Sequence, residues 1–551
     1  MKTSFRLVLA QLDFTVGALD ANAARMREVM AEARQRLGAQ LVLFPELALC
    51  GYSPEDLLLR PGFLAACRTT LDELAHASAG LTGLVGYPLP MAASEGMVTG
   101  AEPCLANAVA ILRDGALTGH YAKQALPDYG VFDERRYFRP GADSCVVAVR
   151  GLRVGVLVCE DIWSDGPIDD ACAEGAELIV VLNASPYAQG KQARRRAVLT
   201  RQARRHGVGI AYLNLVGGQD ELLFDGASLL VDADGTIAAE APAFVDALLA
   251  ADYDPATRRF HAIDWPAPVT DDLAGLYAGL ARGLRDYVDK NGFPGVLLGL
   301  SGGIDSALTL ALAVDALGPE RVTAVMLPSR YTSELSLQGA RAQAERLGVA
   351  YQVLSIEPGR EALLTTLAPA FAGKAADLAE ENVQARLRGV LLMALSNKHG
   401  QLLLTTGNKS EVAVGYATLY GDMCGGYAPL KDVYKTLVYR LARWRNGTAA
   451  EAVIPWEVIE RPPSAELRED QTDQDSLPPY DVLDAILERF IEGDRSQSEI
   501  VLEGFDAGLV QRIVRLVYLN EFKRRQAAPG PKVTARAFGR ERRYPITSKW
   551  R

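Results

Sequence analysis

Short apolar runs alternate with stretches of helical spacing along the first half of the chain. Residues 5–12 alternate apolar and polar positions, and residues 40–44 are nearly all apolar, so both predict strands; residues 22–37 between them predict a helix. The same patterns predict strands at 152–158, 178–182, 209–215 and 227–231, a helix opening near 167–169, and a hairpin turn at 232–235. This repeated alternation indicates a layered α/β domain.

A second α/β region follows an interruption at Trp265-Pro-Ala-Pro268. A new helix is predicted from about Thr270-Asp-Asp272, so we place the boundary between domains at residues 1–265 and 270–551. Beyond it the pattern predicts strands at 295–300, 321–327, 351–356 and 401–405, and helices at 306–317, 333–347 and 381–398. Such a βαβ series predicts a parallel sheet with ligands at the carboxyl ends of its strands. The polar, proline-bounded residues 463–479 predict a loop.

Composition narrows the class of protein. The 551 residues are 49% apolar and 23% charged, which excludes wholesale disorder. With 58 Lys and Arg against 68 Asp and Glu, the net charge of −10 argues against a nucleic acid as the main partner. No apolar run approaches the ~18 residues of a membrane helix, and residues 1–7 resemble no signal peptide, so we expect a cytoplasmic protein without a membrane partner. Seven cysteines without a CxxC pair suit a reducing compartment, and five histidines without HExxH argue against a catalytic transition metal.

Three residues of the first half are candidates for covalent chemistry. Cys159 ends an apolar strand and precedes Glu160-Asp161, where a thiol can project into a cleft and act as a nucleophile. A lone cysteine is more often a small buried hydrophobe, so two other segments carry weight. Glu46 is a carboxylate in the apolar context Phe-Pro-Glu-Leu, which suits a general base. Lys123 lies among apolar and aromatic residues and is either a surface charge or a fixed cation beside an oxyanion.

In this chain order, Glu46, Lys123 and Cys159 with their flanking residues resemble the nitrilase superfamily of carbon–nitrogen hydrolases over most of residues 4–260. The resemblance implies an αββα sandwich in which Glu46 takes the proton of Cys159, and Lys123 stabilises the oxyanion and favours the thiolate. Cys159 then attacks an amide and forms a thioester with loss of ammonia. Glu134 resembles the accessory carboxylate of such sites. Residues that resemble the glutamine pocket of amidotransferase members, with plain packing or solvation as the alternative for each, are Tyr52, Tyr129, Glu160, Ser185 and Lys191.

The second half carries a candidate phosphate-binding loop, Leu300-Ser-Gly-Gly-Ile-Asp-Ser306, between a predicted strand and a predicted helix. Glycines, serine hydroxyls and a helix N-terminus form an anion nest. The loop is not a Walker A motif, and the chain has no GxGxxG, so a redox dinucleotide is not indicated. A glycine-rich βα turn is the plain alternative for SGG alone. The full SGGxDS resembles the PP-loop of ATP pyrophosphatases, which implies a Rossmann-like sheet and cleavage of ATP to AMP and pyrophosphate.

Segments 381–388, 406–411, 415–423, 432–435 and 470–480 narrow this resemblance to NAD synthetases, and the two halves together resemble the glutamine-dependent members of that family. The resemblance assigns ATP to Leu300, Ser301, Gly303, Ser306 and Thr406, and Mg²⁺ to Asp305 and Glu411. It assigns the deamido-dinucleotide or its adenylate to Asn382, Arg386, Glu411, Asp422, Lys435 and Asp473. Arg542 and Arg543 resemble the family's C-terminal basic residues. Gln474 replaces a glutamate expected there, which removes an ionic role, and a solvated acidic loop is the alternative for this segment.

The implied reaction is a relay that forms the last step of NAD biosynthesis. Ammonia released from glutamine at Cys159 passes through a protected passage, before it is protonated, to a carboxylate activated by AMP transfer. One alternative is a different PP-loop amidating enzyme, but an asparagine synthetase needs a cysteine after the initiator and residue 2 is Lys. A guanylate synthetase uses a Cys-His-Glu set, which the five histidines do not suggest. The other is a nucleotide-binding sensor without turnover. The resemblance also implies a homo-oligomer, with a dimer of synthetase domains or a larger assembly.

Overall fold

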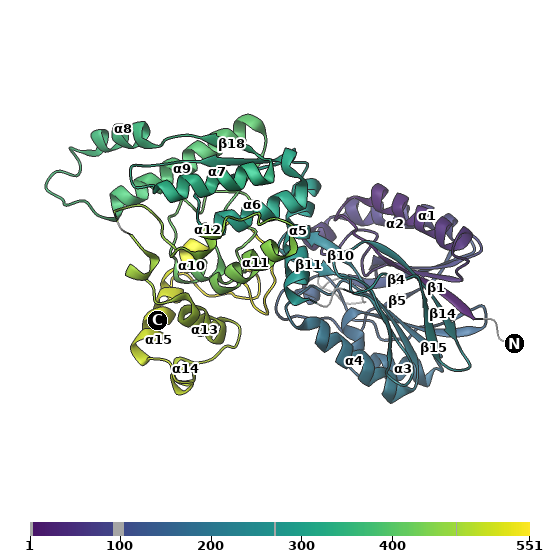
Figure 1. The fold of residues 1–551 in the computed structure, drawn as a ribbon. Coiled ribbons are helices and arrows are strands. Elements are labelled where there is room, and N and C mark those ends of the chain that lie inside the picture. Colours follow the sequence, from purple (N-terminus) through teal and green to yellow (C-terminus); the bar gives the residue numbers. More distant parts are fainter. Residues whose placement is uncertain (1–3, 92–103, 269–270, 470, 551) are drawn as a thin grey trace. The chain divides into compact units, whose positions relative to one another are not determined.

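The computed structural model describes residues 4–91, 104–268, 271–469 and 471–550 (Figure 1). The predictions that fall on Met1–Thr3, Thr270 and Asp470 lie outside these residues. The chain divides into two compact units, one comprising Met1–Gln219 with Leu223–Gly275 and the other Asp220–Leu222 with Leu276–Arg551. Each unit has its own sheets and its own apolar core.

The first unit is a sandwich of two sheets with helices outside them. Its larger sheet has the order β15 (Arg259–Ile263), β14 (Ala247–Asp254), β1 (Phe5–Gln11), β2 (Leu41–Leu43), β3 (Thr82–Pro90), β4 (Leu105–Arg113), β5 (Ala116–Ala122). The second has the order β13 (Ile237–Glu240), β12 (Leu229–Val231), β9 (Gly209–Asn214), β8 (Leu178–Asn183), β7 (Leu152–Val158), β6 (Val146–Val149). A separate hairpin pairs β10 (Val216–Gln219) with β11 (Leu222–Asp225).

Helices cover the outer faces of this sandwich (Figure 1). The helices α1 (Leu19–Gln35) and α2 (Pro61–Ala75) lie on the larger sheet, and α3 (Gly166–Ala173) and α4 (Lys191–His206) lie on the other. The 3-10 turns are η1 (Glu55–Leu59), η2 (His76–Ser78), η3 (Glu134–Arg136) and η4 (Cys159–Ile162). One buried cluster contains side chains of both sheets, such as Leu9 and Leu43 with Val156 and Val180, so the core lies between the sheets. The expected αββα arrangement is confirmed.

The second unit contains a four-stranded sheet in the order β18 (Ala350–Val353), β17 (Val322–Met326), β16 (Val296–Gly299), β19 (Leu402–Leu404). Every pairing is parallel, as expected from the βαβ pattern. One face packs on α5 (Asp272–Lys290), α6 (Ile304–Leu317) and α7 (Glu334–Leu347), and the other packs on α9 (Leu378–His399). The carboxyl ends of the strands therefore open toward the loops that follow Gly299, Met326 and Leu404.

The remaining elements of the second unit are short helices and turns. They are η5 (Pro319–Arg321), α8 (Glu357–Leu367), α10 (Lys409–Val414), α11 (Lys435–Thr448), α12 (Trp456–Glu460), η6 (Asp473–Asp475), α13 (Tyr480–Ile491), α14 (Gln497–Leu502), α15 (Ala507–Leu519) and α16 (Glu521–Arg524). The loop predicted over residues 463–479 is confirmed in its described part, apart from the 3-10 turn η6. Within the described residues no helix is both long and apolar enough to span a membrane.

The sequence pattern located the buried strands β7, β8, β9 and β16 within about a residue of their bounds, and the turn between β12 and β13 is the expected antiparallel hairpin. It missed α4, whose sixteen residues KQARRRAVLTRQARRH are mostly charged or polar. Its buried positions Arg195, Leu199, Gln202 and Ala203 include only two apolar side chains, so the helical stripe is not an apolar stripe. That polar inner face bears on the chemistry of the first unit.

Candidate active sites

The candidate nucleophile Cys159 lies where β7 ends and η4 begins. Its backbone has a φ of 45°, in the left-handed region that non-glycine residues rarely adopt. Such strain persists only where surrounding contacts fix it, and it is common at reactive positions. The residue is buried, and the charges that act on its thiol are those of Glu46, Lys123, Glu134 and Glu160. The sharp turn explains how a strand-end cysteine becomes a candidate reactive group.

Lys123, which follows β5, joins two carboxylates in a fully buried cluster. Its Nζ donates to Glu46 Oε1 at 2.7 Å and to Glu134 Oε1 at 2.8 Å. Glu46 also accepts from Asn107 Nδ2 at 2.7 Å and from the backbone N–H of Ala184 at 2.9 Å. Three donors from different parts of the chain therefore fix this carboxylate, which is what a positioned general base needs. The three residues that the sequence analysis expected to act together converge, with Glu134 beside them.

Electrostatics keep the resting thiol protonated. Burial raises the pKa of Cys159 well above its ordinary value, Glu46 adds to the rise, and Lys123 opposes it. Lys123 thus favours the thiolate, but burial and Glu46 together outweigh its effect on the pKa. Burial lowers the pKa of Lys123, yet the attraction of Glu134 and Glu46 outweighs burial and raises it, so the lysine stays charged. The thiol must therefore lose its proton to a base during the reaction, which gives Glu46 a task.

Burial also raises the pKa of Glu134, to about 7, while Lys123 lowers it and Glu46 raises it. Its Oε2 is buried without a hydrogen-bond partner in the described part of the chain. The Tyr52 hydroxyl donates to Glu134 Oε1 at 3.4 Å. An accessory carboxyl with such a pKa can change its charge near neutral pH.

Asp161 is a buried carboxylate that the sequence analysis did not single out. It accepts from the backbone N–H groups of Val158 at 3.0 Å, Gln124 at 3.1 Å and Ala125 at 2.8 Å, and from the Tyr121 hydroxyl at 2.8 Å. Burial raises its pKa to about 6, and the hydrogen bonds oppose that rise. One side chain therefore fixes the turn that carries Cys159 against the segment that follows Lys123. A carboxylate two residues after the nucleophile was the signal that could have identified it.

The five residues expected to bind glutamine are distributed around this cluster. The Tyr129 hydroxyl contacts both carboxylate oxygens of Glu160 at 3.0 Å, and both side chains reach solvent. Ser185 is buried in the loop after β8, and Lys191 Nζ donates to the Pro186 carbonyl at 2.9 Å in the same loop. Tyr52, described above, lies against Glu134. Three of the five are thus close to the buried cluster. Glu160 directly follows Cys159, Ser185 directly follows Ala184, whose N–H donates to Glu46, and Tyr52 contacts Glu134.

The SGGIDS loop of the second unit lies between β16 and α6. Ser306 Oγ accepts from the Ser301 N–H at 3.2 Å and donates to the Gly303 carbonyl at 2.9 Å, so the serine closes the loop on itself. Gly302 has a φ of +79°, and a Cβ there would lie 2.4 Å from the Ser336 carbonyl oxygen. Only glycine fits this position. The Gly303 N–H donates to Ser301 Oγ at 3.2 Å, so the N–H groups of Ser301 and Gly303 are both engaged within the loop, and α6 begins directly after it at Ile304.

Lys435 lies between two carboxylates in this unit as well. Its Nζ is 2.5 Å from Asp305 Oδ2 and 3.1 Å from Glu411 Oε1, and Asp305 also accepts from Asn408 Nδ2 at 2.8 Å. Burial raises the pKa of Glu411 to about 8, against the effect of Lys435. Nearby, Asp473 accepts from Tyr480 at 2.8 Å and from Tyr416 at 3.3 Å.

Of these residues, Asp305, Glu411, Tyr416, Lys435 and Asp473 line a cavity of about 280 Å³ at the carboxyl ends of the parallel strands. Of the residues expected to contact ATP, the dinucleotide or a metal ion, ten line it: Leu300, Ser301, Gly303, Asp305, Ser306, Thr406, Glu411, Asp422, Lys435 and Asp473. Asn382 and Arg386 are not among the lining residues; Asn382 Oδ1 accepts from the hydroxyl of Thr418, which does line the cavity, and Arg386 Nε donates to the Leu419 carbonyl. Lining residues that the sequence analysis missed include Arg388 and Arg461.

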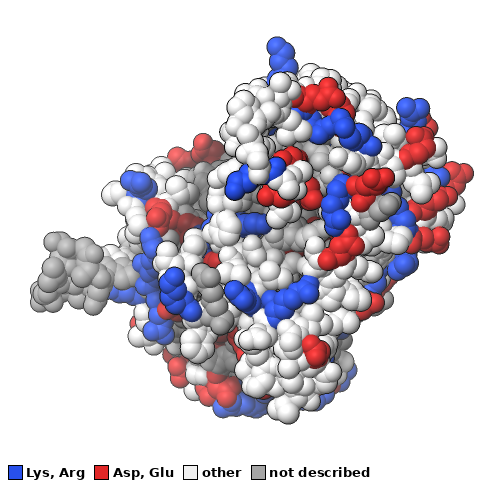
Figure 2. Space-filling view, turned by 90° about the vertical axis from the view of Figure 1, so that its left-hand side faces the viewer, with Lys and Arg blue, Asp and Glu red and all other residues white. Residues whose placement is uncertain are grey.

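The C-terminal basic residues lie outside this lining. Arg542 is buried, donates to Glu521 at 3.0 Å and stacks on Tyr544, while Arg543 donates to the Arg540 carbonyl at 2.9 Å. Gln474 is exposed on η6 beside Asp473. On the face shown in Figure 2, basic and acidic side chains are interspersed. In the described residues no three His, Cys, Asp or Glu side chains form a group that could hold a metal ion, and all seven cysteines are free.

Comparisons with known proteins identify the family of each half of the chain. The carbon–nitrogen hydrolase family matches residues 6–261, and the NAD synthase family matches residues 276–527. The chain is therefore an α/β protein that joins a carbon–nitrogen hydrolase domain of the nitrilase type to an NAD synthase domain.

Relatives over the full length define the combination. A glutamine-dependent NAD(+) synthetase of Xanthomonas campestris is 56% identical over 99% of this chain and 98% of the relative, and one of Xylella fastidiosa is 54% identical over the whole of both. The structure of the glutamine-dependent NAD⁺ synthetase of Acinetobacter baumannii in complex with ADP has a TM-score of 0.78 at 45% identity, covering 100% of this chain and 99% of that chain. A Cytophaga hutchinsonii synthetase with a TM-score of 0.83 at 22% identity, over 99% and 98% of the two chains, shows the same fold. The chain belongs to the glutamine-dependent NAD(+) synthetase family, whose members are glutamine-hydrolysing ligases with ATP as a substrate.

Proposed function

We propose that this chain converts deamido-NAD to NAD⁺ with ATP and the amide nitrogen of glutamine, and that the two sites described above carry the two half-reactions. One observation supports the division most strongly: the first unit has a buried thiol with a positioned carboxylate and lysine, and the second has a phosphate-type loop on the wall of a 280 Å³ cavity. Neither set of residues can do the work of the other.

In the first half-reaction Glu46 takes the proton of Cys159, and the thiolate attacks the side-chain amide carbon of glutamine. Lys123 stabilises the oxyanion of the tetrahedral intermediate, since its charge is fixed before the reaction begins. The carbon–nitrogen bond breaks, the leaving nitrogen takes the proton from Glu46, and ammonia and a thioester result. Water, deprotonated by Glu46, then hydrolyses the thioester to glutamate and restores the thiol. Tyr52, Tyr129, Glu160, Ser185 and Lys191 are proposed to bind the substrate, with Glu160 paired to its α-ammonium group.

In the second half-reaction the carboxylate of deamido-NAD attacks the α-phosphorus of ATP, and pyrophosphate leaves. The loop at 300–306 and Thr406 are proposed to hold the phosphates, because the serine hydroxyls and the N-terminus of α6 suit an anion. Ammonia then attacks the mixed anhydride, and AMP leaves with formation of the amide. Asn382, Arg386, Glu411, Asp422, Lys435 and Asp473 are proposed to contact the dinucleotide or its adenylate.

Asp305 and Glu411 would supply two of the ligands that Mg²⁺ needs, and the phosphates of ATP would supply others. Asp305 and Glu411 converge within 3.1 Å of one cation, the Lys435 ammonium, so their oxygens already face a common point. Carboxylate oxygens are the ligands that this hard ion prefers. When bound, Mg²⁺ would offset the charge of the phosphates. Lys435 holds the two carboxylates together and limits their repulsion.

We also propose where the chain acts, how it assembles and how ammonia travels. The chain acts in the cytoplasm, as its free cysteines suit a reducing compartment, and it assembles as a homo-oligomer, at least a dimer of synthetase domains. Ammonia reaches the second site before it is protonated, because ammonium is not a nucleophile.

The substitution Cys159→Ala tests the proposed function. It removes the thiol, so NAD⁺ formation with glutamine is expected to fall by about 10³-fold or more. NAD⁺ formation with ammonium chloride at pH 8.5 is expected to stay within about twofold of the unsubstituted chain, because the second site is unchanged. The matched control is Cys172→Ala, which removes a half-buried cysteine of α3. Equal loss with both nitrogen sources in a folded Cys159→Ala chain would contradict the proposal.

A further inference from the structure

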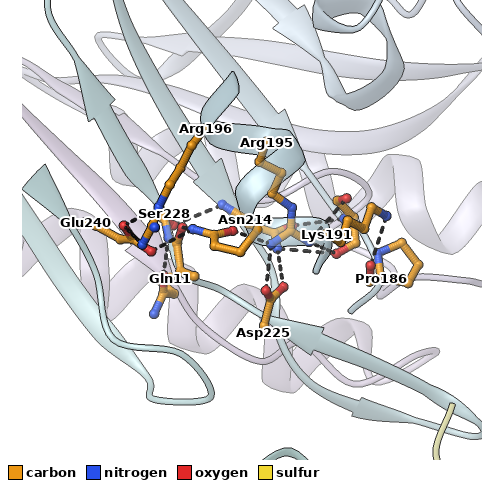
Figure 3. A network of polar contacts seen from close by, with 12 residues as sticks. Gln11, Pro186, Lys191, Arg195, Arg196, Asn214, Asp225, Ser228 and Glu240 are labelled. Atoms are coloured by element: carbon orange, nitrogen blue, oxygen red, sulfur yellow. Dashed lines mark hydrogen bonds and ion pairs between the residues drawn. The ribbon is translucent and has the colours of Figure 1, made fainter. Parts of the chain in front are cut away.

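Arg195 is a buried arginine on the inner face of α4, and the chemistry proposed above does not use it. Together with Leu199, Gln202 and Ala203 it follows the buried stripe of that helix, and its side chain has no solvent exposure. Arg196, the next residue, points away to Glu240 and is exposed (Figure 3). A guanidinium that gives up water needs a full set of partners, so its contacts show what it holds.

Two of its three nitrogens have partners, which are a carboxylate, a side chain of the same helix and Ser185; Nε is buried without a hydrogen-bond partner in the described part of the chain. Arg195 Nη1 lies 2.6 Å from Asp225 Oδ2, at the end of β11, and 3.0 Å from Gln192 Oε1. Arg195 Nη2 donates to the Ser185 carbonyl at 2.9 Å and to Ser185 Oγ at 3.3 Å. The planar fork of arginine can reach both Asp225 and Ser185 at once, whereas a lysine ammonium is a single point.

Asn214, at the end of β9, contacts the same serine. Its Oδ1 accepts from the Ser185 N–H at 2.9 Å, and its Nδ2 donates to the Ser185 carbonyl at 3.3 Å and to Asp225 Oδ1 at 3.2 Å. The Asn214 N–H in turn donates to Ser228 Oγ at 3.0 Å (Figure 3). Ser185 is therefore fixed through its N–H, carbonyl and hydroxyl by groups from α4 and β9.

The loop that Arg195 and Asn214 hold connects the proposed general base, Glu46, to the residues proposed to bind glutamine. The N–H of Ala184, one residue earlier, donates to Glu46 Oε2, and Lys191 ends the loop at the start of α4. Ala184 directly follows β8, whose pairing with β7 and β9 fixes it independently. Ser185 to Gly190 lack such strand pairing. The Tyr187 N–H donates to the Leu223 carbonyl at 2.6 Å, and the placement of Ser185 itself depends on Arg195 and Asn214.

We propose that Arg195, together with Asp225 and Asn214, is a positioning residue that fixes the loop from Ser185 to Lys191 and thereby sets the affinity of the first site for glutamine. The inference rests on the proposed function and adds a determinant of substrate binding to it. Arg195 acts through the loop and does not contact the reacting atoms. Loss of the clamp weakens binding of glutamine and leaves the thiol with its base.

The electrostatics agree with this placement. Burial would lower the pKa of Arg195, but the attraction of Asp225 outweighs it and raises the pKa, and the thiolate form of Cys159 acts in the same direction. The guanidinium is thus permanently charged close to the reacting thiol.

The test compares Arg195→Lys with the control Arg196→Lys in the full-length chain. Arg195→Lys keeps the charge that faces Asp225 but loses the second arm of the fork, so the KM for glutamine is expected to rise by about tenfold or more while kcat stays within about threefold. Arg196→Lys is expected to change neither quantity by more than about twofold, because the ion pair of Arg196 is with Glu240 rather than with Asp225, and a lysine keeps the charge that faces Glu240.

Alkylation of Cys159 separates loss of binding from general loss of structure. Iodoacetamide needs only an intact thiol and base, whereas the diazomethyl-ketone analogue of glutamine needs the pocket. In Arg195→Lys, alkylation by the analogue is expected to slow by about tenfold, with the iodoacetamide rate within about twofold of the unsubstituted chain. If Arg195→Lys is too unstable to purify, Asn214→Ala removes the other hydrogen bonds to Ser185 without changing a charge and is expected to give the same pair of results.

Two results would overturn the inference: a glutamine KM equal to that of Arg196→Lys, or an equal slowing of both alkylations. The first result would show that Arg195 does not affect the binding of glutamine. The second would show that Arg195 has only a general structural role. If the unsubstituted chain itself fails to consume glutamine, the proposed function fails and the inference falls with it. An active unsubstituted chain with an unaffected Arg195→Lys variant overturns the inference alone.

Discussion

Both sites place a lysine between two carboxylates, and the contrast between the two clusters separates their chemistry. Lys123 and Glu46 have no exposure at all, and Asn107 and Ala184 also hold Glu46. Around Lys435, the carboxylates of Asp305 and Glu411 are each 17% exposed on a cavity wall. The first cluster is closed to solvent and includes its own nucleophile, Cys159, so its charges act on one reaction, the cleavage of an amide carbon–nitrogen bond. The second is open and balanced by a lysine, so it can accept charged substrates and a cation.

Of the substitutions that test this difference between the two clusters, Lys123→Met is expected to have the largest effect. It removes the oxyanion's cation and leaves two buried carboxylates unpaired, so glutamine hydrolysis is expected to fall by about 10³-fold and the unfolding free energy by about 3–5 kcal/mol. A glutaminase assay and urea unfolding of the full-length chain measure the two effects. Hydrolysis within tenfold of the unsubstituted rate would show that the cluster is not the reaction centre.

Lys435→Met is expected to have a smaller effect on stability, because partly exposed carboxylates can recover water. NAD⁺ formation with ammonium chloride is expected to fall by about 10²-fold, since two carboxylates then face the phosphates unneutralised. Alkylation of Cys159 by iodoacetamide is expected to stay unchanged. Lys398→Met, an exposed position at the end of α9, is the matched control. A stability loss as large as that of Lys123→Met would remove the distinction between closed and open clusters.

The smallest effect is a pH dependence that Glu134→Gln removes. Burial raises the pKa of Glu134 from 4.5 to about 7, so its contribution to stability is complete below about pH 4.5 and is lost as the pH rises through 7. The amide side chain in the Glu134→Gln variant does not titrate. The unfolding free energy of Glu134→Gln relative to the unsubstituted chain is therefore expected to rise by about 2–3 kcal/mol between pH 4.5 and 7.5.

Urea unfolding at the two pH values checks this prediction. Glu73→Gln, at an exposed position of α2, is the control and is expected to show no such change. A difference for Glu134→Gln that stays constant with pH would mean that Glu134 is ionised throughout.

The sequence located the parts of both sites that follow strands. Glu46, Cys159 and the loop at 300–306 each come shortly after an apolar run that forms a strand, β2, β7 and β16 respectively, and the end of a strand is where a polar side chain can leave the core. Asp161, Arg195 and Asn107 could not be found in this way, because their roles come from contacts with segments distant in the chain. A charged residue on the buried stripe of α4 was a signal for Arg195, but that stripe is too polar to be recognised from the sequence.

Helix α9 shows a second limit. Ala385, Arg388, Gly389 and Leu392 line the cavity at the spacing of one helix face, whereas the family motif pointed to Asn382 and Arg386. A motif fixes residue types along the chain, and the rotation of the helix decides which of them face the cavity. Substrate contacts of Asn382 and Arg386 therefore stay predictions.

Transfer of nitrogen from glutamine to the product tests the central claim most directly. The full-length chain is supplied with deamido-NAD, ATP, Mg²⁺, glutamine labelled with ¹⁵N in its side-chain amide, and an equal concentration of unlabelled ammonium at pH 7. We expect most of the NAD⁺ to carry ¹⁵N in its carboxamide by mass spectrometry, and Cys159→Ala to yield only unlabelled NAD⁺. Unlabelled NAD⁺ from the unsubstituted chain, with glutamine consumed, would contradict the claim that one site supplies the nitrogen of the other.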